Sequence, residues 1–167
     1  SLTSLDNRLS RLMEPRASAP HKRLAAMRAL SDAGIRVIVQ IAPVIPAIND
    51  TEIEQILAAA KENGASQATH IPVRLPLEVA ELFREWLTKH FPDRARKVMK
   101  LIQSLRGGKD YDSRFGARMR GSGPYADLIR SRFIKAARDQ GFKGRKYDLA
   151  TDLFERPSKP SDQMSLF

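Results

Sequence analysis

Residues 35–76 read IRVIVQIAPVIPAINDTEIEQILAAAKENGASQATHIPVRLP and carry two apolar segments separated by a helical pattern. The first segment, residues 35–46, is rich in β-branched side chains, which predicts a strand buried on both faces of a parallel sheet. Residues 51–64 predict a helix that ends at a glycine, and residues 66–76 predict the next strand. Three polar residues are candidate N-caps for that helix, namely Asn49, Asp50 and Thr51. A strand, a helix and a strand joined by short links predict a right-handed βαβ unit.

The residues upstream continue this alternation. Residues 19–34 predict an amphipathic helix with Pro20 in its first turn and Gly34 at its end. Its predicted apolar face consists of Leu24, Met27, Ala29 and Leu30. Residues 1–6, SLTSLD, predict the end of an earlier strand. About three parallel strands cannot close a barrel, so the sequence predicts an α/β fold that is either an open part of a (β/α) barrel or a small open sheet. Functional groups of such barrels gather at the C-terminal strand ends, here Ser1–Asp6, Ala42–Asn49 and Val73–Pro76.

The pattern changes after residue 76. Residues 77–91, 93–108 and 124–142 each show helical periodicity, and a segment rich in Gly and Arg separates the last two. The first of these helices has an apolar side formed by Val79, Leu82, Phe83, Trp86 and Leu87. The sequence therefore predicts three regions, which are a partial α/β barrel (1–76), a basic helical region (77–143) and a flexible tail (144–167).

The 167 residues carry a net charge of +10, and the positive charge is concentrated in one half. Residues 94–146 contain 16 Lys and Arg against 4 Asp and Glu, which favours a polyanionic partner, nucleic acid first, over a merely solvated basic surface. The sequence has no cysteine, which excludes disulfides and Cys-ligated metal sites within these residues and fits a cytoplasmic protein. The 3 histidines are not spaced as a metal motif, so no metal site is predicted. No apolar run approaches the ~20 residues of a membrane span, so no membrane association is predicted.

Several short motifs follow one another in a recognisable order. They are Ser1 with Thr3, Glu14-Pro15, Arg23-Leu24, Ala33-Gly34, APVIP at 42–46, Asn49-Asp50, and the later stretch RGGKDYDSRFGARMRGSGPYADLI. Their order and spacing resemble the second half of radical S-adenosylmethionine (SAM) enzymes, most of all the spore photoproduct lyase-related branch. The later stretch is similar to the C-terminal region of a bacterial subgroup of that branch. The resemblance covers residues 1 to about 142.

The resemblance implies a longer parent protein. In that family a partial (β/α)6 barrel holds a [4Fe–4S] cluster on a C-x3-C-x2-C loop after the first strand, and the cluster cleaves SAM to a 5′-deoxyadenosyl radical. This chain departs from the pattern because it has no cysteine. The resemblance therefore implies that the cluster loop and the first three strands lie upstream of Ser1, and that the chain is a fragment carrying strands four to six. The parent is expected to be a lyase-like radical SAM enzyme, whereas the activity of this chain alone is left open.

The resemblance also implies a SAM pocket at the strand ends. The cofactor-binding residues that it assigns are Ser1, Thr3, Ala42, Pro43, Val73 and Arg74. A guanidinium such as that of Arg74 pairs well with a carboxylate. The alternative is structural, because Ser and Thr at strand ends commonly form turns and an Arg before a strand-terminal Leu-Pro can be a surface group. Arg23 is expected to form a structural ion pair with Glu14. No catalytic residue is assigned, although Tyr111 and Tyr125 are candidates for a hydrogen-atom or proton relay.

The segment GGKDYDSRFGARMRGSG, residues 107–123, is the predicted substrate region. Its candidate nucleic-acid contacts are Tyr111, Arg114, Phe115, Arg118 and Arg120. Arginines bind phosphates and aromatic rings stack on bases, so this mixture suits single-stranded or extruded nucleotides of the kind a repair enzyme handles. The alternative is a loop that packs over the open barrel with its arginines paired to acids.

The chain ends in QMSLF, residues 163–167, after a Pro-containing polar stretch. This pentapeptide resembles the motif by which bacterial repair and replication proteins bind the sliding clamp, with Met in place of the usual Leu. Gln163 would bond the pocket rim, and Leu166 and Phe167 would fill an apolar pocket. The alternative is a tail that packs on its own domain or stays free.

Two hypotheses from different classes follow. In the first, the chain is part of a nucleic-acid-directed radical SAM enzyme of the lyase-like, DNA-repair-like kind. In the second, it is a non-catalytic module that binds DNA through residues 106–145 and a sliding clamp through its tail.

Overall fold

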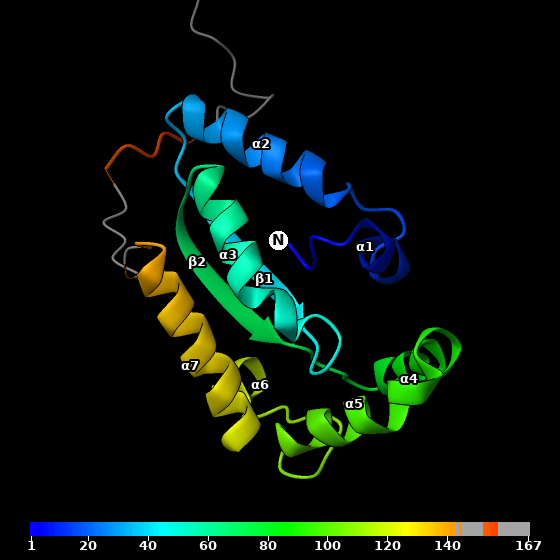
Figure 1. Cartoon of the computed structure of the whole chain (residues 1–167). Coiled ribbons are helices and arrows are strands. Elements are labelled where there is room, and N and C mark those ends of the chain that lie inside the picture. The colour runs from blue at the N-terminus through cyan, green and yellow to red at the C-terminus, as the bar shows by residue number, and fades with distance from the viewer. Residues whose placement is uncertain (143, 145–151, 157–167) are drawn as a thin grey trace, which may run out of the picture.

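The computed structural model describes residues 1–142, 144 and 152–156. Its elements are α1 (Asn7–Met13), α2 (Pro20–Asp32), β1 (Val37–Val44), the 3-10 turn η1 (Asp50–Glu52), α3 (Ile53–Glu62), β2 (Ala65–Pro72), α4 (Val79–His90), α5 (Pro92–Ser104), α6 (Ala117–Arg120) and α7 (Pro124–Asp139). The elements form a curved, open arrangement, with α2 and α1 on one arm and α7, α6, α5 and α4 on the other (Figure 1).

Two parallel strands lie at the centre of the molecule. β1 pairs with β2 in a register that runs from Val37 opposite Ala65 to Val44 opposite Pro72. α3 connects the two strands and packs against both of them. The α/β class and the βαβ unit predicted from residues 35–76 are confirmed.

The third predicted strand is absent from the described residues. Residues 1–6 run beside β1, but only one backbone hydrogen bond joins them to it, from Leu2 N to Gln40 O at 2.9 Å. The next contact is made by a side chain, since the Thr3 hydroxyl oxygen lies 3.3 Å from Ala42 O. A ladder needs repeated backbone pairs, so this segment is an extended edge and not a strand.

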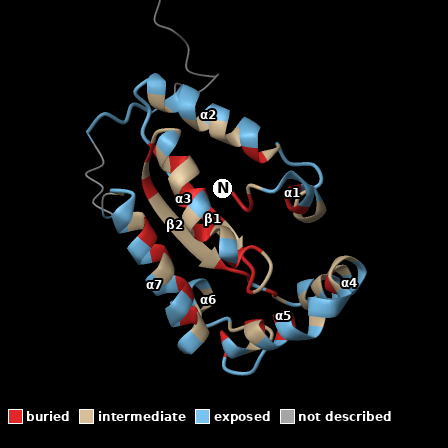
Figure 2. Cartoon of the chain, viewed as in Figure 1, coloured by how far each residue is buried: buried red, intermediate tan, exposed pale blue. Residues whose placement is uncertain are grey.

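One face of the sheet is covered by helices. α2 and α3 pack on the strands, and α7 packs on α3 (Figure 1). The buried core between these layers includes Val39, Ile41, Ile53, Ile56, Leu57, Ile129 and Phe133. Burying an aliphatic side chain of this size contributes about 1.5–3 kcal/mol, so these layers hold the sheet in place. Figure 2 shows the buried residues of α3 and α7 on the sides that face each other.

The opposite face of the sheet is open. The alternate residues of β1 that point to this side are less buried, and Ile38 is 41% exposed. Gln67 of β2 pairs with Ile38 and is only 8% exposed, so this face is open beside Ile38 and partly covered beside Gln67. The strand predicted to be buried on both faces is therefore buried on one face only.

A second core lies beyond the C-terminal ends of the strands. α4 and α5 form a hairpin whose inner side packs on the segments that follow the strands. Its buried members are Ile45, Val73, Leu75, Leu87, Val98, Met99 and Ile102. Of the apolar side predicted for residues 77–91, Leu87 is fully buried whereas Leu82 is 60% exposed. The hairpin therefore forms a wall beyond the C-terminal ends of the strands.

Three local predictions need correction. The sequence reading missed α1, although Asp6 accepts hydrogen bonds from the amides of Arg8 and Leu9 and so caps the helix. On α2, Leu24 and Met27 touch the core as predicted, but Leu30 is 44% exposed because the helix lies at the rim. Finally, no side chain among the three candidate N-caps caps α3, which begins through the turn η1.

The predicted boundaries at residues 76 and 143 stay predictions. α7, which belongs to the second predicted region, packs on α3 of the first. Most of the predicted tail lies outside the described residues. Within the described part of the chain, no helix has the length and apolarity that a membrane span requires.

Candidate functional site

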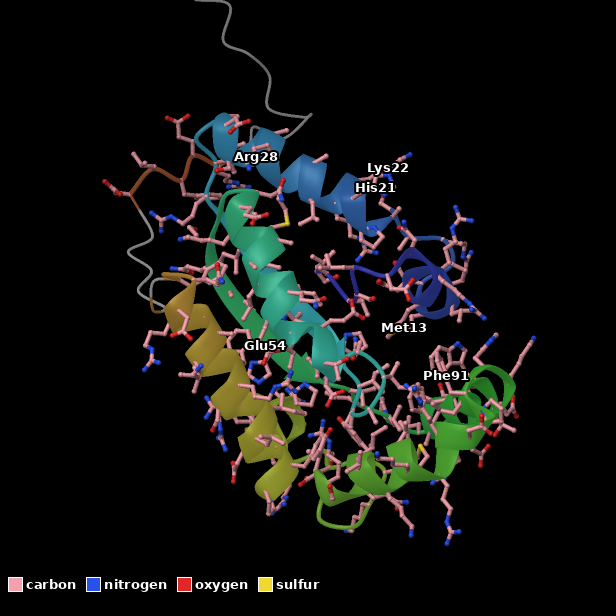
Figure 3. All side chains as sticks on the ribbon, viewed as in Figure 1. Met13, His21, Lys22, Arg28, Glu54 and Phe91 are labelled. Carbon is pink, nitrogen blue, oxygen red and sulfur yellow. The ribbon has the colours of Figure 1, made fainter. Side chains whose placement is uncertain are left out.

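A cavity of about 690 Å³ lies at the C-terminal ends of β1 and β2. One side is formed by the strand ends and the segment that follows β2, and the other by α1 and α4. Figure 3 labels Met13, a lining residue at the end of α1, on the side of that helix nearest to α4. A volume of this size is typical of sites for small molecules and cofactors.

Five of the six residues predicted to bind the cofactor line this cavity. They are Ser1, Ala42, Pro43, Val73 and Arg74. They come from three separate segments. Parallel pairing of β1 with β2 brings two of these segments together, and the bond from Leu2 N to Gln40 O holds the N-terminal segment beside them. Thr3, the sixth, is 1% exposed and does not line the cavity.

Thr3 belongs instead to a structural network. Its hydroxyl donates to Glu14 Oε2 at 2.7 Å, and Arg23 pairs with the same carboxylate oxygen at 3.2 Å. Arg23 also donates to Ser1 O at 3.0 Å. The predicted pairing of Arg23 with Glu14 is confirmed, and the network holds the backbone of Ser1 at the cavity edge.

Arg74 is the one cation among the residues that line the cavity. Its Nη1 lies 3.4 Å from the sulfur of Met119 on α6, and no described acid lies within ion-pair distance of it. A guanidinium without an internal counter-ion at the edge of an apolar cavity can bind a carboxylate or phosphate in two-pronged fashion.

The far wall is aromatic. Phe83 and Trp86 line the cavity and stack with ring centroids 5.6 Å apart. The indole N–H of Trp86 donates to Leu12 O at 3.0 Å, which fastens α4 to α1. The sequence reading placed both rings on the apolar side of a helix but missed their place in the site. Nothing in the spacing alone indicates that α4 turns back over the strand ends.

Asn49 fixes the geometry of the strand ends. Its side chain accepts from Ile45 N at 2.6 Å and donates to Thr3 O at 2.8 Å and to Pro43 O at 2.9 Å. The residue is 1% exposed. Asn49, predicted as a helix cap, is therefore a brace that joins the N-terminal segment to the end of β1.

Arg106 links the cavity to residues 107–123, which we call the basic segment. Its guanidinium donates to Val73 O at 2.8 Å and to the carbonyls of Ala117 and Arg118, both at 3.1 Å. The side chain is 2% exposed, and burial lowers the pKa of the guanidinium from its ordinary value. The sequence reading missed this residue because a single Arg in a basic run carries no sign of burial.

Several side chains of the basic segment contact one another. Arg114 pairs with Asp112 at 2.7 Å, and the hydrogen bonds from Arg114 lower the pKa of that carboxyl to about 2. Phe115 is 93% exposed, and the Arg118 guanidinium carbon lies 5.6 Å from its ring centroid. Arg120 is exposed, whereas Tyr111 is half-buried. Phe115 and Arg118 are thus the pair that the structure brings together on the surface.

Two of the glycines in this segment have a packing role. Side-chain atoms at Gly121 or Gly123 would lie 3.3 and 3.2 Å from the carbonyls of Leu105 and Ser104. Both glycines also have positive φ angles, of 72° and 86°. They let the chain pass close to the end of α5 before α7 begins.

Tyr125 is bonded to a buried carboxylate. Its hydroxyl donates to Asp50 Oδ2 at 2.6 Å, and Asp50 is 3% exposed. Burial, followed by the bond to Asp50, raises the pKa of Tyr125 to about 12. Neither residue lines the cavity. This position supports a structural role at the junction of α7 with the end of β1.

The two cofactors implied by the resemblance fit the described residues differently. SAM fits, because the cavity offers a free guanidinium for its carboxylate and apolar and aromatic walls for the rest. A [4Fe–4S] cluster does not fit, because the sequence has no cysteine and no group of three potential His, Asp or Glu ligands gathers among the residues described. His70 packs on Phe133 with centroids 4.3 Å apart, and burial lowers its pKa.

The predicted clamp-binding residues Gln163, Leu166 and Phe167 lie outside the described residues. No protein-family model matches the chain, and neither the curated proteins nor the solved structures contain a match to it.

Proposed function

We propose that this chain binds SAM in the cavity at its strand ends and forms the cofactor-holding part of a cytoplasmic, nucleic-acid-directed radical SAM enzyme, with its sheet as part of a (β/α) barrel. One observation supports this above all others. Five of the six residues assigned to SAM from sequence, drawn from three separate segments, line a single cavity. The radical chemistry itself belongs to a cluster that these residues do not hold, so no reaction step is assigned to this chain.

The residues of the cavity have distinct tasks under this proposal. Arg74 would pair with the carboxylate of the methionine moiety. Phe83 and Trp86 would contact the adenine, since aromatic rings prefer stacked or tilted partners. The backbone of Ser1, held by Arg23, would offer hydrogen-bonding groups to the ammonium or ribose. Bound SAM supplies a sulfonium whose activated carbon–sulfur bond is the reactive group.

The single tryptophan of the chain provides the test, because Trp86 lines the cavity. Titration with SAM or S-adenosylhomocysteine should change its fluorescence, with calorimetry as a second readout. Arg74→Gln should weaken binding about 10- to 100-fold, which corresponds to the loss of one charge-assisted bond. Arg36→Gln is the matched control, since Arg36 is exposed and precedes β1 at the opposite end of the strands.

The outcomes separate cleanly. Weaker binding in Arg74→Gln with unchanged binding in Arg36→Gln supports the proposal. An equal loss in both variants would point to a non-specific charge effect, and no saturable binding by the folded chain would refute the cofactor role.

A second candidate function is a binding module for DNA and a sliding clamp. It is favoured by the exposed Phe115 and its neighbour Arg118, because bases stack on such rings and guanidinium groups. Phe115→Ala should lower affinity for single-stranded DNA by about 1–3 kcal/mol. Unchanged affinity would remove this ring from the nucleic-acid site.

The clamp interaction has its own test. The full chain should bind a bacterial sliding clamp, and alanine at both Leu166 and Phe167 should abolish binding. If the double variant binds as well as the native chain, the C-terminal motif has no role in such an interaction.

A further inference from the structure

The hairpin of α4 and α5 carries a basic surface outside the predicted substrate segment. Two adjoining hollows of about 500 and 610 Å³ lie along it and share Arg96 and Lys100. Figure 3 shows nitrogen-tipped side chains extending outward from this hairpin. We name this surface the α5 face and define it by Arg94, Arg96, Lys97 and Lys100.

The charges of the α5 face have no internal partners among the described residues. None of the four cations belongs to an ion pair there, and Asp93 is the one acid on the helix. Arg96 and Lys97 precede Lys100 by four and three positions, so the three side chains share one side of α5, about 5–6 Å apart. Cations held this close repel one another, and an external polyanion relieves that repulsion.

The apolar residues of α5 point the other way. Val98, Met99 and Ile102 are buried in the second core, and none of the large exposed apolar side chains of the described residues lies on α5. A membrane-binding helix needs apolar groups to insert, and a protein interface needs apolar or aromatic anchors. A surface of unpaired cations without such anchors fits a phosphodiester backbone best.

The α5 face is continuous with the segment that carries Phe115. Arg84 and Gln103 line one of the hollows, and both bond to Asp110, at 2.7 and 3.0 Å. The segment therefore leaves the edge of the hollow and reaches the exposed ring five residues later. No aromatic side chain is exposed on α5 itself, so base stacking belongs to the segment and backbone contact to the helix.

We infer that the α5 face binds the phosphate backbone of a nucleic-acid duplex beside the place where Phe115 contacts an unstacked nucleotide. This inference rests on the nucleic-acid part of the proposed function and adds the form of the ligand and the surface that holds it. Three of the residues involved, Arg96, Lys97 and Lys100, are absent from the contacts predicted by sequence.

The test uses the full chain and a fluorescent 20-base-pair DNA duplex at several salt concentrations. The variant replaces three cations with glutamine, Arg96→Gln, Lys97→Gln and Lys100→Gln. The slope of log affinity against log salt should become shallower by about 2.7, and affinity near 0.1 M salt should fall on the order of 100-fold. The matched control removes three exposed, unpaired charges near α1 and α2, as Arg8→Gln, Arg16→Gln and Lys22→Gln, and should lose less than about threefold.

The affinities of the two triple variants for the duplex distinguish the outcomes. A large loss confined to the α5 variant, with the folded state checked by circular dichroism, supports the inference. Equal losses in both triple variants, an equal loss for a single strand of the same length, or no duplex binding by the native chain overturns it. A duplex RNA run beside the DNA shows which backbone is preferred, and binding of either supports a phosphodiester ligand.

The inference and the cofactor proposal fail separately. SAM titration of the same triple variant, followed at Trp86, should be unchanged because none of the three cations lines the cavity. If the native chain binds the duplex but not SAM, the cofactor role is refuted and the inference about the α5 face stands. If the native chain binds SAM but not the duplex, the inference about the α5 face is refuted and the cofactor role stands.

Discussion

Replacing Arg106 with methionine should release the basic segment from the strand ends. The native guanidinium makes three hydrogen bonds to carbonyls, one on Val73 and two on the α6 segment, and is 2% exposed. Methionine keeps most of the volume but none of the donors. The Val73 carbonyl would then be left buried and unpaired, whereas the carbonyls of Ala117 and Arg118 can regain water.

The magnitude follows from these groups. One buried carbonyl without a partner costs about 1–3 kcal/mol, and each charge-assisted bond contributes about 1.5–3 kcal/mol before the guanidinium's own burial is offset. We therefore expect Arg106→Met to lower the free energy of unfolding by about 2–4 kcal/mol. Urea unfolding measures this as a lower midpoint at unchanged slope, and amide exchange should quicken in residues 107–123.

Arg84→Met is the control for this prediction. Arg84 anchors the same segment through Asp110, but its side chain is 45% exposed, so its pair should contribute at most about 1 kcal/mol. If both variants lose the same stability, or if Arg106→Met loses less than about 0.5 kcal/mol, burial does not make Arg106 an anchor and the reasoning is wrong.

Three further outcomes are expected. Asn49→Ala should lower the free energy of unfolding in urea by about 2–4 kcal/mol, because it leaves one buried amide and two carbonyls unpaired. A loss below about 0.5 kcal/mol, as for a surface substitution, would show that Asn49 does not hold the strand ends together. The pKa of Tyr125 is about 12 in the folded state, against 10 in the unfolded chain, so the free energy of unfolding should fall as pH rises from 10 to 12. Tyr125→Phe should remove this pH dependence. If the variant shows the same dependence as the native chain, the buried bond between Tyr125 and Asp50 does not cause it. Trp86→Phe should lower stability by about 0.5–1.5 kcal/mol through loss of the bond to Leu12 O, and an unaltered unfolding midpoint would show that this bond does not fasten α4.

The sequence was sufficient for the βαβ unit because its signals are local. An apolar β-branched run, a helix of period 3.6 ending at a glycine, and a second apolar run leave few arrangements other than a parallel pair. Functional groups of such folds gather at the C-terminal strand ends, and the resemblance to radical SAM enzymes assigned six residues there, of which five line one cavity.

The missed features depend on partners far away in the chain. The brace at Asn49 reaches Thr3, 46 positions away, and the anchor at Arg106 reaches Val73, 33 positions away. The side chains that look like a cap or a surface cation acquire these roles only when the fold brings the buried carbonyls within 3 Å or so.

What the sequence determined by itself is therefore the α/β class, the order of its central elements and the concentration of positive charge. Hydrophobic periodicity, glycine stops and net charge are properties of neighbouring residues, so they survive without a fold. Tertiary structure alone decided that residues 1–6 form an edge and not a strand, that Phe83 and Trp86 line the cavity, and that the cations of α5 line hollows beside the segment around Phe115. Each of these depends on which surfaces are buried when helices distant in the chain pack together. That packing depends on all the layers of the fold at once, so no short stretch of sequence determines it.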